Sequence, residues 1–160
     1  MILQLDKHVF SLTDRYTISD ELGNPIYQVH GHLFTFGKKL ELLDMTGNEL
    51  AKIQQRVFSL QSEYDILQGD QVTMIVKKEL FSFLHPRFTV EGVAGSYEME
   101  GDWLNWNSEI RTGGTVVARI SQKFAIFQDK YGMEITDGAD VPLLICLAIV
   151  MDEIAHPKNN

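Results

Sequence analysis

The sequence predicts a mostly β domain in which a closed antiparallel β-barrel of two β repeats surrounds a central hydrophobic C-terminal α-helix. Three observations lead to this fold class: short β-rich segments separated by turn residues, an internal repeat, and an uncharged run from Val141 to Met151. At 160 residues, a single domain over residues 1–160 is expected.

Short segments rich in β-branched and aromatic residues recur along the chain. They are separated by pairs such as Gly23-Asn24, Gly47-Asn48 and Gly113-Gly114, which readily adopt the positive φ angles that tight hairpin turns need. This spacing is typical of an antiparallel meander that closes into a barrel or a sandwich. The expected strand segments are 16–18, 26–29, 40–43, 51–57, 72–76 and 88–90.

Part of the chain repeats itself at a constant offset of 67 residues. The pattern A-[KR]-I-x-Q-[KR]-x4-Q-x2-Y begins at Ala51 and again at Ala118. We therefore expect two copies of one β unit, at about residues 16–67 and 88–135.

Strand periodicity assigns the faces of the two copies, because alternate side chains point to opposite sides of a sheet. The apolar face should point inward, and it carries Ala51, Ile53 and Val57 in one copy and Ala118, Ile120 and Phe124 in the other. The basic face should point outward, and it carries Lys52, Arg56, Arg119 and Lys123.

The uncharged run predicts a helix over about residues 141–155 that is buried on every side. A helix that is apolar all round must be surrounded by protein or lipid. Eleven residues, at about 1.5 Å each, are too short for a bilayer core of about 30 Å. Asp140 suits the N-cap, Pro142 the first turn, and Pro157 the stop. A helix inside a closed barrel covers both its own surface and the inner faces of the strands.

Composition and charge narrow the classes of function. A net charge of −8 and a pI near 5.0 oppose generic attraction to phosphate polymers or anionic membranes, so no nucleic-acid partner is expected and lipid binding would need a local basic patch. The single cysteine, Cys146, lies inside the apolar run and predicts a buried thiol in a reducing compartment. The first residues do not resemble a secretory signal, and no transmembrane segment is expected. We expect a cytoplasmic protein that can lie at the membrane periphery.

The chain resembles the LURP-one-related family over nearly its whole length. The resemblance rests on K-x-V-F-S-L-x-D-x-Y-x-I from Lys7, D-E-L-G-N-P-I-Y-x-V from Asp20, K-K-E-L-F-S-F from Lys77 and A-I-V-x-D from Ala148. It implies a fold similar to the tubby C-terminal domain, a barrel of about a dozen strands around a hydrophobic helix, and a distant relation to phospholipid scramblases. It also implies that basic side chains on the barrel bind lipid head groups, as tubby domains do.

Two groups of basic residues are candidates for binding a lipid or a partner. The first flanks the apolar run 80–84 between the repeats, as in a loop whose apolar side chains enter a membrane interface while its cations meet phosphates. The second is the outward basic face of the repeats, if the two copies lie close together. The alternatives are an ordinary connection packed on the barrel and solvated residues paired with nearby acids. The candidates are Lys77, Lys78, His85, Arg87, Lys52, Arg56, Arg119 and Lys123.

The sequence predicts no catalytic residues, metal or cofactor. His30 and His32 share a strand face but lack a third ligand nearby, and the familiar nucleotide-binding and hydrolase motifs are absent from the sequence. We expect a non-enzymatic tubby-like binding module for a membrane lipid or a protein. One alternative is a small-ligand-binding protein or enzyme that uses a barrel-end cavity near Asp152 and His156, where a carboxylate and an imidazole meet. Another is an intracellular structural or regulatory protein with no lipid role.

Overall fold

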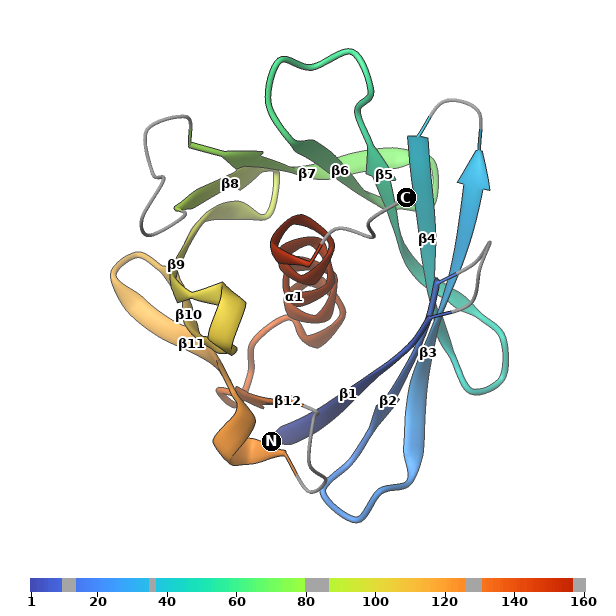
Figure 1. Ribbon diagram of the computed structural model, residues 1–160, viewed down its shortest axis with the longest axis vertical. Coiled ribbons are helices and arrows are strands. Elements are labelled where there is room, and N and C mark those ends of the chain that lie inside the picture. The colour runs from blue at the N-terminus through green and yellow to red at the C-terminus, as the bar shows by residue number, and fades with distance from the viewer. Residues whose placement is uncertain (10–13, 35–36, 80–86, 126–130, 157–160) are drawn as a thin grey trace.

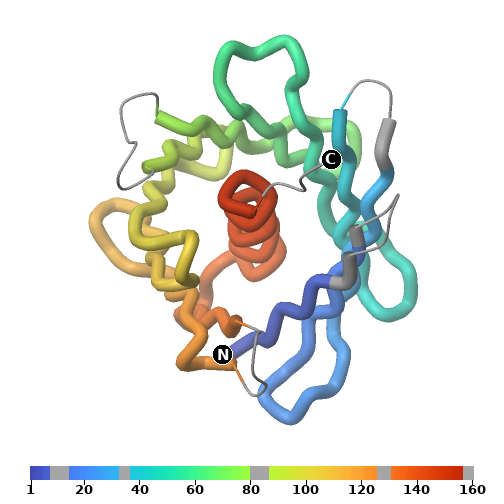
Figure 2. The backbone as a smooth tube through the Cα atoms, in the orientation of Figure 1, coloured from blue at the N-terminus to red at the C-terminus, as the bar shows by residue number. Residues whose placement is uncertain are grey.

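Antiparallel strands form a closed ring around one α-helix in the computed structural model, which describes residues 1–9, 14–34, 37–79, 87–125 and 131–156 (Figures 1 and 2). Each strand pairs with its neighbours in the chain, and β1 pairs with β12 to close the ring. The predicted fold class, a mostly β closed barrel with a central C-terminal helix, is confirmed.

The strands follow one another without a crossover. Within the described residues they are β1 (Ile2–Val9), β2 (Asp14–Ser19), β3 (Pro25–Phe34), β4 (Gly37–Asp44), β5 (Glu49–Gln55), β6 (Glu63–Gln68), β7 (Gln71–Lys78), β8 (Phe88–Gly92), β9 (Gly95–Asp102), β10 (Asn107–Thr112), β11 (Thr115–Ser121) and β12 (Tyr131–Ile135). Short 3-10 helices, η1 (Trp103–Asn105) and η2 (Gln122–Phe124), follow β9 and β11, and α1 (Val141–Ala155) follows β12.

Hairpins form at the predicted turns. Gly113 and Gly114, between β10 and β11, have φ angles of +55° and +79°, as a two-residue hairpin with positive φ at both positions requires. At two other hairpins the carboxylates of Asp20 and Asp44 accept hydrogen bonds from backbone N–H groups two and four residues further on. These local bonds reverse the chain sharply and keep successive strands adjacent.

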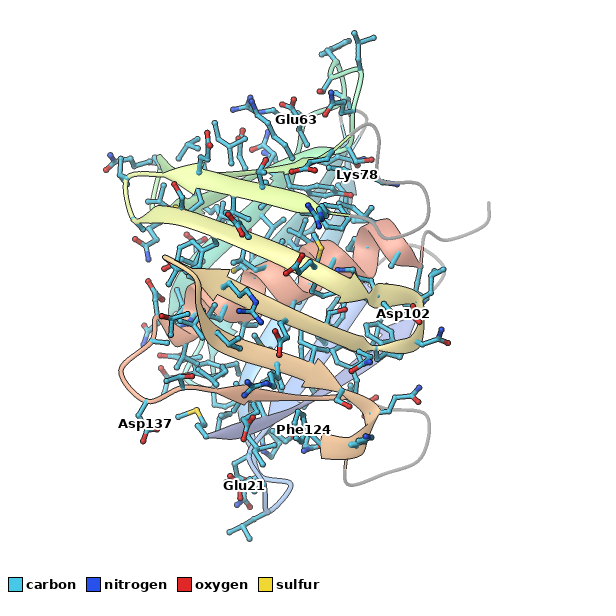
Figure 3. The ribbon with its side chains drawn as sticks, turned by 90° about the vertical axis from the view of Figure 1, so that its left-hand side faces the viewer. Glu21, Glu63, Lys78, Asp102, Phe124 and Asp137 are labelled. Carbon is cyan, nitrogen blue, oxygen red and sulfur yellow. The ribbon has the colours of Figure 1, made fainter. Side chains whose placement is uncertain are left out.

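The meander sorts the connections onto the two ends of the barrel. Connections that follow odd-numbered strands lie at the end where α1 finishes, which we call the helix-end rim. Connections that follow even-numbered strands lie at the other end, the opposite rim, where the chain enters α1. Figure 3 shows Lys78 and Asp102 at the helix-end rim and Asp137 at the opposite rim.

The helix completes the core. Every residue from Leu143 to Glu153 is buried, and the carboxylate of Asp140 accepts a hydrogen bond from the N–H of Leu143 at 3.1 Å as the predicted N-cap. Inward side chains of the strands pack around it, each contributing about 1.5–3 kcal/mol before the entropy cost of ordering.

The repeated segments occupy β5 with β6 and β11 with β12. Ala51, Ile53, Ala118 and Ile120 are buried as expected. The prediction that Val57 continues the inner face is wrong, because β5 ends at Gln55 and the chain then leaves the barrel wall, with Val57 44% exposed. Phe124 likewise lies beyond β11, in η2, and is only partly buried. That the two halves are copies of one unit stays a prediction.

Candidate functional site

A buried charged cluster surrounds the last turn of α1. The side chains of Asp152 and Glu153 are each 2% exposed, and the amine of Lys7 on β1 lies 2.7 Å from Oδ2 of Asp152 and 3.1 Å from Oε1 of Glu153. Lys38 on β4 forms a second ion pair with Oε2 of Glu153. Because an unpaired buried charge costs several kcal/mol, each ion here depends on its partners.

Tyrosine hydroxyls complete the cluster. The Tyr16 hydroxyl lies 2.5 Å from Oδ2 of Asp152 and 2.7 Å from Oε1 of Glu153, and its single proton can be donated to only one of them at a time. Burial, and then the two carboxylate charges, hold the pKa of Tyr16 well above its ordinary value. Tyr16 therefore stays a neutral donor.

The matching tyrosines of the two repeated segments are both buried, and the charge of Glu153 raises the pKa of each. Burial, and then the charge of Glu153, raise the pKa of Tyr64 to about 12. Burial, and then the charges of Asp152 and Glu153, raise the pKa of Tyr131 well above its ordinary value, and its hydroxyl has no hydrogen-bond partner in the described structure. The cluster thus draws on both halves of the barrel.

In this cluster the positive charges of the lysines balance the negative charges of the carboxylates. Burial alone favours the neutral amine of Lys7, but the charges of Asp152 and Glu153 outweigh burial and raise the pKa of Lys7. Two lysines and two carboxylates therefore neutralise each other in a nearly closed space. This arrangement joins β1, β2 and β4 to the end of α1.

An aromatic stack lies beside the cluster at the helix-end rim. The indole of Trp106 stacks on the ring of Tyr131, with centroids 3.9 Å apart, and on the imidazole of His156, with centroids 4.3 Å apart. His156 Nδ1 lies 3.2 Å from Oδ1 of Asp152. Trp106 has a φ of +51°, which is rare for a bulky residue, and it forms the C-cap of η1, with its backbone N–H donating to the carbonyl of Trp103.

The predicted small-ligand or enzymatic role near Asp152 and His156 needs a substrate to reach the carboxylates. Three hollows of the described surface lie elsewhere. One of about 470 Å³ is lined by residues that include Arg87, Glu100 and Glu109, one of about 300 Å³ by residues that include Lys39, Lys52 and Asp70, and one of about 450 Å³ by residues that include Tyr97, Asp140 and Leu144. The role near Asp152 and His156 stays a prediction.

The outward basic residues of the repeated segments lie next to acids. The guanidinium of Arg56 is 2.8 Å from Asp65, the amine of Lys52 is 3.2 Å from Glu49, and the guanidinium of Arg119 is 3.1 Å from Glu109. Lys123 is exposed in η2.

The ring keeps the two basic pairs apart. Lys52 and Arg56 belong to β5 and its end, whereas Arg119 and Lys123 belong to β11 and η2, and these strands lie on opposite sides of the barrel (Figure 1). The condition under which the pairs would form one phosphate-binding surface is therefore not met. Each pair remains a separate candidate.

The candidates between the repeats gather at the helix-end rim. Lys77 and Lys78 end β7, and Arg87 directly precedes β8, with its guanidinium 3.7 Å from Glu100. His85 and the apolar run 80–84 lie outside the described residues. The N–H of Lys78 donates to the carbonyl of Ser62 at 3.3 Å, which places the end of β7 beside the connection between β5 and β6.

Sequence reasoning missed the exposed apolar side chains of that connection. We call residues 56–62 the apolar loop. Phe58 is 91% exposed and Leu60 is fully exposed, and the loop projects outward between β5 and β6 (Figure 1). Ser59 and Gln61 alternate with Phe58 and Leu60 as they would in a continuing strand, so the local sequence carried no signal that the strand had ended.

Charge is divided unequally between the two rims. At the opposite rim, the described segments 19–25, 43–49, 68–71, 91–95, 112–115 and 135–141 contain no lysine or arginine. Their carboxylates are Asp20, Glu21, Asp44, Glu49, Asp70, Glu91, Asp137 and Asp140. The lysines and arginines described in or next to the connections of the helix-end rim are Lys7, Arg15, Lys38, Lys39, Arg56, Lys77, Lys78, Arg87 and Lys123. The carboxylates in or next to those connections are Asp6, Asp14, Glu63, Glu79, Glu100, Asp102, Asp152 and Glu153, and at the opposite rim Arg111 directly precedes segment 112–115.

Among the described residues, no helix is both long and apolar enough to cross a bilayer. The same part of the chain contains no group of three or more His, Cys, Asp or Glu side chains arranged to hold a metal ion. His30 lies 3.2 Å from the side-chain oxygen of Gln28, and His32 lies 4.0 Å from Glu41.

Known proteins share this sequence pattern and fold. A family model described as LURP-one-related matches residues 1–152. The uncharacterized protein YxjI of Bacillus subtilis (strain 168) is 29% identical over 155 residues, covering 96% of this chain and 93% of that protein. A protein from Arabidopsis thaliana of known X-ray structure has a TM-score of 0.66 at 14% identity, covering 96% of this chain and 91% of that one. This last likeness concerns the fold alone.

Proposed function

The chain belongs to the LURP-one-related family, and on this premise we propose that it is a non-enzymatic binding module that attaches peripherally to anionic lipid surfaces. The contact lies at the helix-end rim, in the sector of β5 to β8. Its cations are Lys77, Lys78 and Arg87.

The unequal division of charge between the rims carries this proposal. The protein has a net charge of −8, so an anionic surface repels it as a whole. Because the carboxylates of the opposite rim lie at the far end of the barrel, that repulsion is weakest when the helix-end rim faces the surface. Each lysine or arginine close to an anionic membrane adds about 1 kcal/mol of attraction. Charge therefore orients the barrel before any close contact forms.

Among the basic residues of the helix-end rim, exposure and ion pairs indicate which ones can reach a lipid. Lys7 and Lys38 are paired with the buried carboxylates, and Arg56 is held by Asp65 and Glu63. Lys77 is exposed at the end of β7, and the side chain of Arg87 is 65% exposed, with its guanidinium 3.7 Å from Glu100. Both side chains therefore stand on the surface of the rim, where lipid phosphates can approach them.

Co-sedimentation with vesicles tests the proposal. The purified protein would be mixed with vesicles of phosphatidylcholine alone and with vesicles that contain phosphatidylserine, at low and at physiological salt. We expect binding to the anionic vesicles only, and weaker binding at higher salt because ions screen the attraction. Lys77→Gln/Lys78→Gln/Arg87→Gln should lose this binding.

A matched variant separates a local contact from an effect of net charge. Lys52→Gln/Arg111→Gln/Arg119→Gln removes as many positive charges from the wall of the barrel, at positions that are not among the cations of the helix-end rim, and should bind nearly as the native protein does. Circular dichroism would check that both variants are folded. Equal loss in both variants, or no binding of native protein to either vesicle, would contradict the proposal, and the second result would direct the search to a protein partner.

A further inference from the structure

We infer that the apolar loop, residues 56–62, inserts into the hydrocarbon boundary of the bilayer, so that the partner is an assembled membrane rather than a soluble phosphate compound. This inference rests on the proposed function and names the part of the protein that enters the lipid. It depends on the exposure, shape and position of the loop.

The apolar side chains of the loop are exposed to water, which is unfavourable for apolar surface. Phe58 is 91% and Val57 is 44% exposed, and Leu60 has no contact that shields it from solvent. The exposed large apolar residues at the opposite rim stand one to a connection, as Leu22 does. Three such residues within one connection are therefore a local concentration of apolar surface, which marks an interaction site.

The base of the loop is fixed while its apolar tip projects. The N–H of Arg56 donates to the carbonyl of Glu63 at 3.0 Å, and the guanidinium of Arg56 is held by Asp65. These bonds close the loop at its root, and the loop projects sideways from the barrel wall (Figure 1). A narrow convex projection can enter a fluid interface without a preformed groove to receive it.

The positive charges next to the loop favour a lipid as its partner. The backbone bond from Lys78 to Ser62 places the cations at the end of β7 beside the last residue of the loop. Apolar side chains flanked by lysine match an anionic interface, in which phosphates lie directly above the acyl chains.

Site-specific labelling tests the insertion. The native chain has one cysteine, Cys146, which is buried, so Phe58→Cys can be labelled selectively with the environment-sensitive dye NBD. Leu22→Cys is a matched control, because Leu22 is 87% exposed and lies in a hairpin of the opposite rim. Both would be mixed with phosphatidylcholine/phosphatidylserine vesicles, with and without lipids that carry a quencher in the acyl chain.

We expect the dye at position 58 to become several-fold brighter on the vesicles and to be quenched by the acyl-chain quencher, whereas the dye at position 22 remains unchanged. Without a label, Phe58→Ser/Leu60→Ser should bind the vesicles at least about tenfold more weakly, because less apolar surface is transferred from water into the bilayer. It should keep the salt dependence of the native protein, since its cations are unchanged.

Other outcomes would overturn the inference in distinguishable ways. If the native protein co-sediments but the dye at position 58 stays in water, and the serine variant binds normally, the contact is purely electrostatic and only the insertion fails. If the dye at position 58 brightens with protein concentration in the absence of vesicles, a second copy of the chain covers the loop. If neither the native protein nor any variant binds vesicles, the proposed function fails as well.

Discussion

Lys7 on the first strand and Asp152 on the last turn of the central helix form a buried ion pair, with Nζ 2.7 Å from Oδ2. The pair connects the barrel wall to the helix inside it. Tyr16 and Glu153 share in the same contacts. These bonds lead to specific expectations about stability.

Lys7→Met should be strongly destabilising. The substitution keeps much of the side-chain volume but leaves Asp152 and Glu153 with less positive charge in a buried space, which costs about 3–5 kcal/mol of unfolding free energy. Urea unfolding followed by circular dichroism would measure the loss. Lys77→Met, at an exposed position, is the control and should change stability by about 0.5 kcal/mol or less. Equal effects of the two substitutions would show that the buried ion pair contributes no more to the free energy of unfolding than an exposed lysine does.

Two tyrosine substitutions should differ although they remove the same atom. Tyr16→Phe deletes a hydroxyl that donates to a buried carboxylate and should cost about 1–3 kcal/mol. Tyr131→Phe deletes a buried hydroxyl without a hydrogen-bond partner in the described structure and should be neutral or stabilising. Unfolding midpoints of the two variants, measured side by side, decide the point. A larger loss for Tyr131→Phe would mean that its hydroxyl is satisfied in solution.

Stability should fall at alkaline pH. The pKa values of Lys7, Tyr16, Tyr64 and Tyr131 are all higher in the folded protein than in the unfolded chain. These groups therefore bind protons more tightly in the folded protein than in the unfolded chain. Their contribution to the free energy of unfolding is fully present below the unfolded pKa values of about 10, and it is lost as the pH rises through the folded pKa values. For Tyr64, a rise from 10.0 to about 12 corresponds to about 3 kcal/mol.

Unfolding free energies measured between about pH 8 and pH 11 would check this dependence. Tyr64→Phe removes one titrating group and should flatten the curve relative to the native protein. A native protein that is as stable at the alkaline end as at the neutral end would contradict the expectation.

Cys146 should react with thiol reagents only after global unfolding. The side chain is fully buried within α1, and burial raises the pKa of its thiol to about 12, so the reactive thiolate is both inaccessible and scarce at neutral pH. Reaction with Ellman's reagent, followed with increasing urea, should track the loss of circular dichroism. Rapid reaction of native protein would show that α1 leaves the barrel without global unfolding.

Local patterns in the sequence predict much of the fold. The turn at Gly113-Gly114, the N-cap Asp140 and the buried helix depend on residues that are close in the chain, and all three are confirmed. The inner face does not extend through Val57 as predicted, because alternation alone does not report where a strand leaves the barrel wall.

The candidate site is harder to predict. In the sequence, Asp152 and Glu153 mark only the end of the apolar run, whereas Lys38 lies 115 positions from Glu153 and carries no local sign that it is buried. Tyr64 and Tyr131 are equivalent in the repeat, but the charge of Glu153 acts on both only because the strands close around α1. Exposed Phe58 and Leu60 follow a predicted strand directly, and no local pattern reports that they project from the barrel.

The position of α1 after all the described strands has a consequence for synthesis on the ribosome. Hairpins between consecutive strands can form as the chain emerges, since their partners are near in sequence. The inner faces of those strands stay uncovered until residues 141–155 leave the exit tunnel, and only then can Lys7 find Asp152. The nascent barrel is therefore most vulnerable to aggregation and most dependent on chaperones just before residues 141–155 emerge.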